Sequence, residues 1–225
     1  DWLIGVVPVS EKLKVHATCF ITTDQLNSDP MWNERVLYSL TNASINTPNL
    51  KFSEAAIPVL SFSSHSDREF SIKTLEQFLK YQTRERREHY ISLLDTHTGI
   101  DSRGAPTMST SNLRELHSRG FDIGAHAVSH PILTCCTSKQ AYDEIGGSKE
   151  TLESVIRGKI KFFAYPNGIP ELDFNQEHIE MVARAGYSAA LTTCKGFACA
   201  ETLPFQIPRF TPWGPSLNRM KLQLA

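Results

Sequence analysis

The sequence predicts an α/β protein built around a parallel sheet. From residue 109 onward, short strand-like segments alternate with helix-like segments, which is the pattern of βαβ units. Hydrophobic residues make up 40% and charged residues 21% of the 225 residues, values typical of a globular chain with a packed core. Polar residues gather where two predicted strands end, and in such folds chemistry collects at the carboxyl ends of strands.

The elements before residue 109 are less regular. Residues 1–13 predict a helix whose apolar face is interrupted by Pro8, and residues 15–21 predict a strand. Residues 25–108 are expected to be a mostly helical insertion into a single domain of residues 1–225. Within it we expect helices over residues 32–40, 71–81 and 84–94, and a strand over residues 56–62.

The regular part follows. We expect helices over residues 111–118, 138–155 and 176–185, and strands over residues 121–125, 159–165 and 188–192. These lengths suit the alternating layers of a parallel α/β fold.

Composition excludes several classes of partner. The net charge is −1 and there is no long basic run, which argues against nucleic-acid binding. No apolar run is long enough for a transmembrane segment. The five cysteines match no zinc framework, so most are expected to be small buried hydrophobic residues. A disulfide between Cys194 and Cys199 stays open and would favour an oxidising compartment.

Two histidines four residues apart, His126 and His130, lie where a predicted strand runs out into a loop. Pro131 favours extended geometry at His130. Two imidazoles held in this way can converge on one divalent cation, usually zinc where the other ligands are nitrogen and oxygen. A metal raises the acidity of bound water and polarises a carbonyl, so the pair indicates hydrolysis. The alternative is a hydrogen-bonded pair in a turn, and the spacing alone does not decide between them.

A second strand end carries equal weight. The aromatic strand that includes Tyr165 breaks into a Pro166-Asn167-Gly168 turn. In the functional interpretation, Asn167 and Gly168 aim backbone N–H groups into a cavity and stabilise an oxyanion. In the structural interpretation, the segment is an ordinary tight loop, because Pro-x-Gly turns are common.

Taken together and in order, these pieces resemble the polysaccharide deacetylases, carbohydrate esterase family 4, also called the NodB-homology domain. Residues 113–130 resemble the family's helix, strand and metal-binding His-x-x-x-His motif, and residues 163–168 resemble its third motif. Other similar stretches are residues 15–20, 185–190 and 207–210 and a closing helix over residues 216–224. Residues 25–108 resemble an insertion found in exopolysaccharide-associated members.

The resemblance implies a distorted (β/α)7 barrel and metal-assisted removal of N-acetyl or O-acetyl groups from a polysaccharide, which we expect to be based on N-acetylglucosamine. In that mechanism an aspartate and two histidines hold the metal, and a second aspartate activates water. Carried over by position, His126 and His130 are the metal ligands, Asn167 supplies the oxyanion N–H, and Tyr165 and Pro166 bind substrate. Zinc is the expected cofactor, with another divalent transition metal as the alternative. The family also suggests an extracellular or cell-envelope location.

Departures from the family pattern shape these expectations. The first family motif, Thr-Phe-Asp-Asp-Gly, holds the base and the third ligand, and the alignment places Asp1 a few residues beyond it. We therefore expect the first barrel strand to be missing, residues 15–21 to lie at an unpaired sheet edge, and the chain as given to show little or no turnover. Ala164 stands where many members have an arginine, and no histidine follows His178.

Two other functions stay open. A non-catalytic carbohydrate-binding relative would keep the groove and lack the aspartates, and an Asp-Asp pair encoded upstream would favour the enzyme over this binder. A metal amidohydrolase acting on a small acylated compound is the third hypothesis. Acetate release from polymer rather than from monomer would separate the polysaccharide deacetylase from this amidohydrolase.

Overall fold

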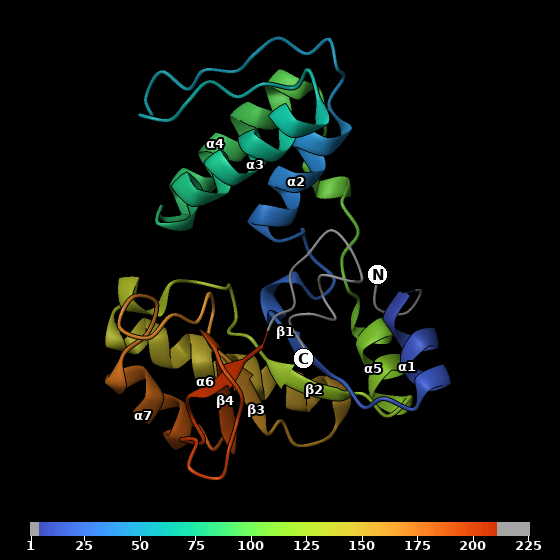
Figure 1. The fold of residues 1–225 in the computed structure, drawn as a ribbon, viewed down its shortest axis with the longest axis vertical. Helices are drawn as coiled ribbons and strands as arrows, with labels where there is room; N and C mark the ends of the chain where they lie inside the picture. The colour runs from blue at the N-terminus through green and yellow to red at the C-terminus, as the bar shows by residue number, and fades with distance from the viewer. Residues whose placement is uncertain (1–4, 211–225) are drawn as a thin grey trace. The chain divides into compact units, whose positions relative to one another are not determined.

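The computed structural model describes residues 5–210. The chain divides into two compact units, which Figure 1 draws: a sheet unit of residues 1–24 and 110–225, and a helical unit of residues 25–109. The expected closing helix over residues 216–224 and the start of the expected helix over residues 1–13 lie outside the described residues. That the second unit is an insertion into the family's domain stays a prediction.

The sheet unit holds strands and helices in alternation. Its strands are β1 (Thr18–Ile21), β2 (Asp122–Ala125), β3 (Phe162–Ala164), β4 (Ala189–Lys195) and β5 (Ile207–Arg209). Its helices are α1 (Val7–Leu13), α5 (Thr110–Ser118), α6 (Ser138–Ile156) and α7 (Gln176–Arg184), with a 3-10 turn η4 (Leu133–Cys135). A further 3-10 turn, η2 (Thr23–Gln25), follows β1.

All five strands are parallel and their order in the sheet is β1-β2-β3-β4-β5. Helix α6 packs against β2 and against its neighbours α5 and α7 (Figure 1). The α/β class predicted from the alternating pattern is therefore confirmed. Parallel strands that follow chain order are also the arrangement of successive strands in a (β/α) barrel, whose closure stays a prediction. Among the described strands, β1 has β2 as its single neighbour.

The strands differ from the expected segments mainly at their ends. β1 begins three residues later than expected, and Val15 is exposed. β4 continues to Lys195, three residues beyond the expected end, and there it pairs with β5. No strand was expected over the residues of β5, which contains Pro208, a residue with no N–H to donate to a ladder. It lies at the edge of the described sheet, where proline is tolerated.

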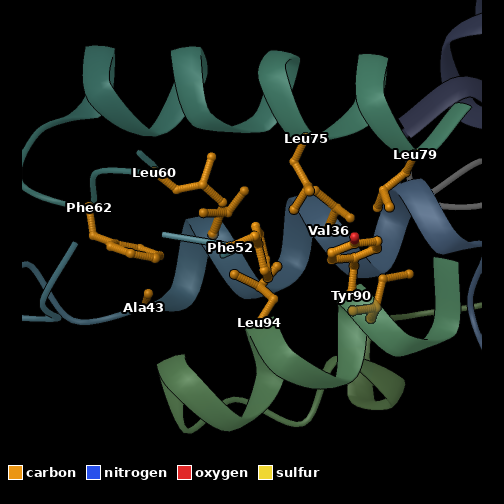
Figure 2. Close-up of a cluster of buried hydrophobic side chains, with 11 residues drawn as sticks. Val36, Ala43, Phe52, Leu60, Phe62, Leu75, Leu79, Tyr90 and Leu94 are labelled. Atoms are coloured by element: carbon orange, nitrogen blue, oxygen red, sulfur yellow. The ribbon is translucent and has the colours of Figure 1, made fainter. Parts of the chain in front are cut away.

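The helical unit consists of α2 (Trp32–Asn42), α3 (His65–Lys80), α4 (Arg84–Thr98) and the 3-10 turn η3 (Ser102–Gly104). Helix α2 packs against α3 and α4, and the buried side chains meet between them, as Figure 2 shows. The largest of these include Phe52, Phe62 and Tyr90, with the ring of Phe52 packed edge to face on Tyr90 at 5.2 Å. This unit therefore has its own hydrophobic core.

Two expectations for the helical unit were wrong. Residues 56–62 form no strand: Leu60 makes a single bridge with Leu50, and Pro58 cannot donate a hydrogen bond to a ladder. The apolar alternation arises because Leu60 and Phe62 pack into the core. Helix α3 begins six residues earlier than expected, since the Ser64 hydroxyl caps it by accepting from the Asp67 N–H at 3.1 Å.

The cysteines also differ from expectation. Cys19 is buried, whereas Cys135, Cys194 and Cys199 are exposed, so most are not small core residues. Cys194 and Cys199 are free thiols, and the disulfide considered for them does not form in the structure. Their exposure follows from the late part of β4 and the connection to β5, whose residues are mostly exposed.

Helix α7 begins at a cap that depends on a neutral histidine. The backbone N–H of Asn175 donates to Nδ1 of buried His178 at 3.1 Å, and the Asn175 side chain accepts from the N–H of Glu177 at 3.1 Å. Burial lowers the pKa of His178, against smaller raising effects of Glu177 and the Leu133 carbonyl. Protonation of Nδ1 would remove the acceptor that the Asn175 N–H uses.

This cap predicts a pH-dependent stability. Below a pH of about 6.5, His178 binds a proton more readily in the unfolded chain than in the folded one, so the free energy of unfolding should fall as the pH drops. Urea denaturation across this range should show that His178→Gln removes part of the slope of this free energy against pH. His65→Gln, at a side chain that is 90% exposed, should leave the slope unchanged. Equal slopes in the chain and in His178→Gln would contradict the prediction.

Candidate active site at the carboxyl ends of the strands

The two sequence motifs meet at the edge of the sheet that is formed by the carboxyl ends of its strands. Ala125, the last residue of β2, is in register with Phe163 of β3, so His126 follows one strand at the level where β3 ends. The backbone N–H of His126 donates to the Ile21 carbonyl at 2.9 Å, which ties the start of the motif to β1. The register of three neighbouring strands therefore sets the height of the first histidine.

His126 is oriented through its ring. Its Nδ1 lies 2.7 Å from the carbonyl oxygen of Ala164, and because a carbonyl only accepts, Nδ1 carries the proton. The lone pair then lies on Nε2, the nitrogen left for a metal. Burial lowers the pKa of His126, the Ala164 bond opposes this, and the positive charge of Arg209 lowers it further. The neutral, ligating form is thus the favoured one.

His130 returns to the same place through a tight loop. The ring centroids of His126 and His130 are 4.7 Å apart and their planes meet at 78°. Ala127 and His130 both have left-handed backbones, with φ of 64° and 58°, so the extended geometry expected at His130 was wrong. Non-glycine residues adopt this conformation at a cost, and such residues cluster at functional sites. The structure therefore brings the two predicted ligands together.

Asn167 lies in a turn braced by β4. Its carbonyl accepts from the Thr193 hydroxyl at 2.7 Å, and the carbonyl of Gly168 accepts from the Thr193 N–H at 2.9 Å. The N–H of Gly168 donates to the Pro166 carbonyl at 2.7 Å, so it is used within the turn. Within the described residues no acceptor meets the N–H of Asn167. Of the two N–H groups expected to face a reacting oxygen, Asn167 therefore supplies the available one.

Tyr165 and Pro166 are both buried, which differs from what a substrate-facing position would show. The Tyr165 ring stacks on Phe174 with centroids 3.8 Å apart, and its hydroxyl donates to the Phe205 carbonyl at 3.1 Å. Burial raises the pKa of this phenol. The geometry gives the tyrosine side chain a packing role beneath the turn, and its assignment to substrate binding stays a prediction.

Arg209 was not singled out from the sequence. It ends β5 at the same edge of the sheet, and its Nε donates to the Thr192 carbonyl at 2.6 Å. Burial lowers the pKa of its guanidinium. No local pattern marks this arginine, because its position depends on the pairing of β4 with β5.

The donor set fits one side of a metal site. Two neutral imidazoles suit zinc, which protein sites hold with three or four ligands. Across residues 5–210, no three side chains of His, Cys, Asp or Glu gather closely enough to hold an ion. The histidine pair is therefore a partial ligand set, and zinc stays a proposal.

No helix in the described part of the chain is both long and apolar enough to cross a bilayer.

The sequence matches the polysaccharide deacetylase family over residues 2–190. The chain belongs to this family. The resemblance drawn from the two motifs is thereby confirmed, and the family is one of hydrolases. A comparison with curated protein sequences finds no match.

Solved structures of deacetylases resemble this chain. The deacetylase domain of BpsB from Bordetella bronchiseptica has a TM-score of 0.52 and 12% identity, over 93% of this chain and 66% of that one. This likeness shows the fold. IcaB from Ammonifex degensii has a TM-score of 0.46 and 17% identity, over 56% of this chain and 57% of that one. The Streptococcus pyogenes deacetylase PplD has a TM-score of 0.44 and 24% identity, over 48% of this chain and 46% of that one. The chain thus spans less than two thirds of each of these proteins.

The turn at Asn167 predicts a contrast between two glycines. Gly168 has φ of +75°, and a Cβ there would lie 3.0 Å from the Thr193 nitrogen. We expect Gly168→Ala to lower the free energy of unfolding by about 1–3 kcal/mol. Gly146, inside α6, has nothing within 4 Å of such a Cβ, so Gly146→Ala should stabilise by about 0.5–1 kcal/mol.

Urea denaturation of both variants checks the contrast. The same sign of change at both positions would show that the turn is not braced as described.

Proposed function

We propose that this chain carries the histidine pair of a metal-dependent hydrolase that removes N-acetyl or O-acetyl groups from a polysaccharide based on N-acetylglucosamine. The observation that carries the proposal is the convergence of His126 and His130, whose ring centroids are 4.7 Å apart. They lie at the carboxyl ends of the strands, where Asn167 also lies. Membership of the polysaccharide deacetylase family and the fold shared with the BpsB deacetylase domain support it.

Each residue has a distinct part in the proposal. His126, oriented by Ala164, and His130 would hold zinc through ring nitrogens. Zinc, when bound, supplies a Lewis acid that polarises the acetyl carbonyl and makes water more acidic. The N–H of Asn167 would donate to the acetyl oxygen as negative charge develops on it. The cationic Arg209 at the same edge would favour that charge.

A non-catalytic carbohydrate-binding relative is the alternative. It is favoured by the ligand set, since the described residues bring two candidate ligands together rather than three. Such a protein would keep the sheet edge as a binding surface for the polymer and would not release acetate. Because the two functions share a fold, the fold does not distinguish them. They differ in whether acetate is released, which an experiment can measure.

Zinc binding tests the histidine pair. Calorimetric titration with Zn²⁺ should give a binding signal that His126→Ala and His130→Ala each abolish, because each removes one of the two converging nitrogens. Alanine at any other histidine should leave the signal unchanged; these are His16, His65, His89, His97, His117 and His178. Loss of zinc binding in one of those six variants, with retention in His126→Ala, would contradict the assignment.

Acetate release separates the enzyme from the binder. A positioned general base contributes about 10²–10⁴-fold, and no carboxylate joins the histidines among the described residues. We therefore expect slow release of acetate from an N-acetylglucosamine polymer in the presence of Zn²⁺, and a further fall in His126→Ala.

An enzymatic assay for acetate and a polymer pull-down measure the two properties together. Polymer binding with no histidine-dependent release would favour the carbohydrate-binding alternative.

A further inference from the structure

We propose that Glu144 is a positioning residue for this site. Its carboxylate holds the backbone between the two histidines in the conformation that brings their rings together. The proposal rests on the proposed function in one respect, namely that the two rings are metal ligands. It adds a residue from α6 that neither sequence motif contains.

Three donors converge on this one carboxylate. Its Oε2 accepts from the backbone N–H of Val128 at 2.9 Å and from that of Ser129 at 2.8 Å. Its Oε1 accepts from the Ser129 hydroxyl at 2.6 Å. Hydrogen bonds to an ionised acceptor are roughly twice as strong as neutral ones. Both carboxylate oxygens are therefore committed to the two central residues of the loop.

The loop needs such a brace because its backbone is strained at both ends. Ala127 and His130 have positive φ values, and they flank the two residues that Glu144 holds. The opposite side of the same segment is held by the 3-10 turn η2, which follows β1. The carbonyl of Ala127 accepts from the Thr23 N–H at 3.3 Å, and that of Val128 accepts from the Asp24 N–H at 2.9 Å. The loop is thus fixed through its carbonyls on one side and its N–H groups on the other.

Helix α6 is a firm support for the carboxylate. Ala141 and Ile145, on either side of Glu144 in the helix, are completely buried. The helix also approaches the loop closely, since a Cβ on Gly147 would lie 3.4 Å from Cγ2 of Val128. Gly147 thereby has a role at this contact. A larger side chain at Gly147 would press on the loop that Glu144 holds.

Amide hydrogen exchange in the metal-free chain tests the brace directly. In Glu144→Ala, the amides of Val128 and Ser129 should exchange about tenfold faster or more, because each loses its acceptor. Glu144→Gln keeps an oxygen acceptor of the same reach and should retain most of the protection. Glu150→Ala removes an exposed carboxylate from the same helix and should exchange like the unchanged protein.

Zinc affinity tests whether the brace positions the ligands. We expect Glu144→Ala to weaken zinc binding about 10–100-fold, as substitutions that disturb ligand orientation do, with recovery in Glu144→Gln. Unchanged amide exchange in Glu144→Ala would overturn the proposal. Faster exchange with unchanged zinc affinity would also overturn it, because Glu144 would then serve the loop alone. If Glu144→Ala does not fold, Glu144→Asp, shorter by one methylene, should lose the protection that Glu144→Gln keeps.

The proposed function can fail separately. If the unchanged protein binds no zinc, that function fails, and the positioning role is then decided by the nuclear Overhauser contact between the rings of His126 and His130. Glu144→Ala should abolish this contact, and its persistence would overturn the positioning role.

Discussion

The hydrogen bond from His126 Nδ1 to the Ala164 carbonyl joins the ends of β2 and β3, and the candidate chemistry depends on it. The bond forms because Ala125 and Phe163 are in register, which places the ring beside the carbonyl at the end of the next strand. It commits one ring nitrogen to the protein and leaves the other for a ligand. A slip of one residue between these strands would move the imidazole to the other face of the sheet.

The same principle extends to the loops beyond the strands. Each loop that carries a candidate functional residue has a left-handed backbone and a partner from another element that holds it. Glu144 of α6 holds the loop between the histidines, and Thr193 of β4 holds the turn at Asn167. Strained backbone persists where surrounding contacts over-determine it, and preorganised sites need such support.

Local pattern was enough to predict the fold class and the meeting of the two motifs, because parallel strands end at a common edge. It was not enough where the outcome depends on distant partners. Residues 56–62 alternate like a strand, yet Leu60 packs into a helical core. The roles of Glu144 and Thr193 depend on hydrogen bonds to residues 15 and 26 positions away in the chain. The start of α3 was readable, since Ser64 followed by Asp67 is a capping pattern.

In the proposed function, His126 presents Nε2 to a metal because its Nδ1 proton is held by the Ala164 carbonyl. Nitrogen-15 NMR of the imidazole rings, recorded before and after addition of Zn²⁺, tests this most directly. Metal-free His126 should be protonated at Nδ1, and zinc should shift its Nε2 resonance together with a ring nitrogen of His130. A proton on Nε2 of His126, or zinc-induced shifts confined to other histidines, would contradict it.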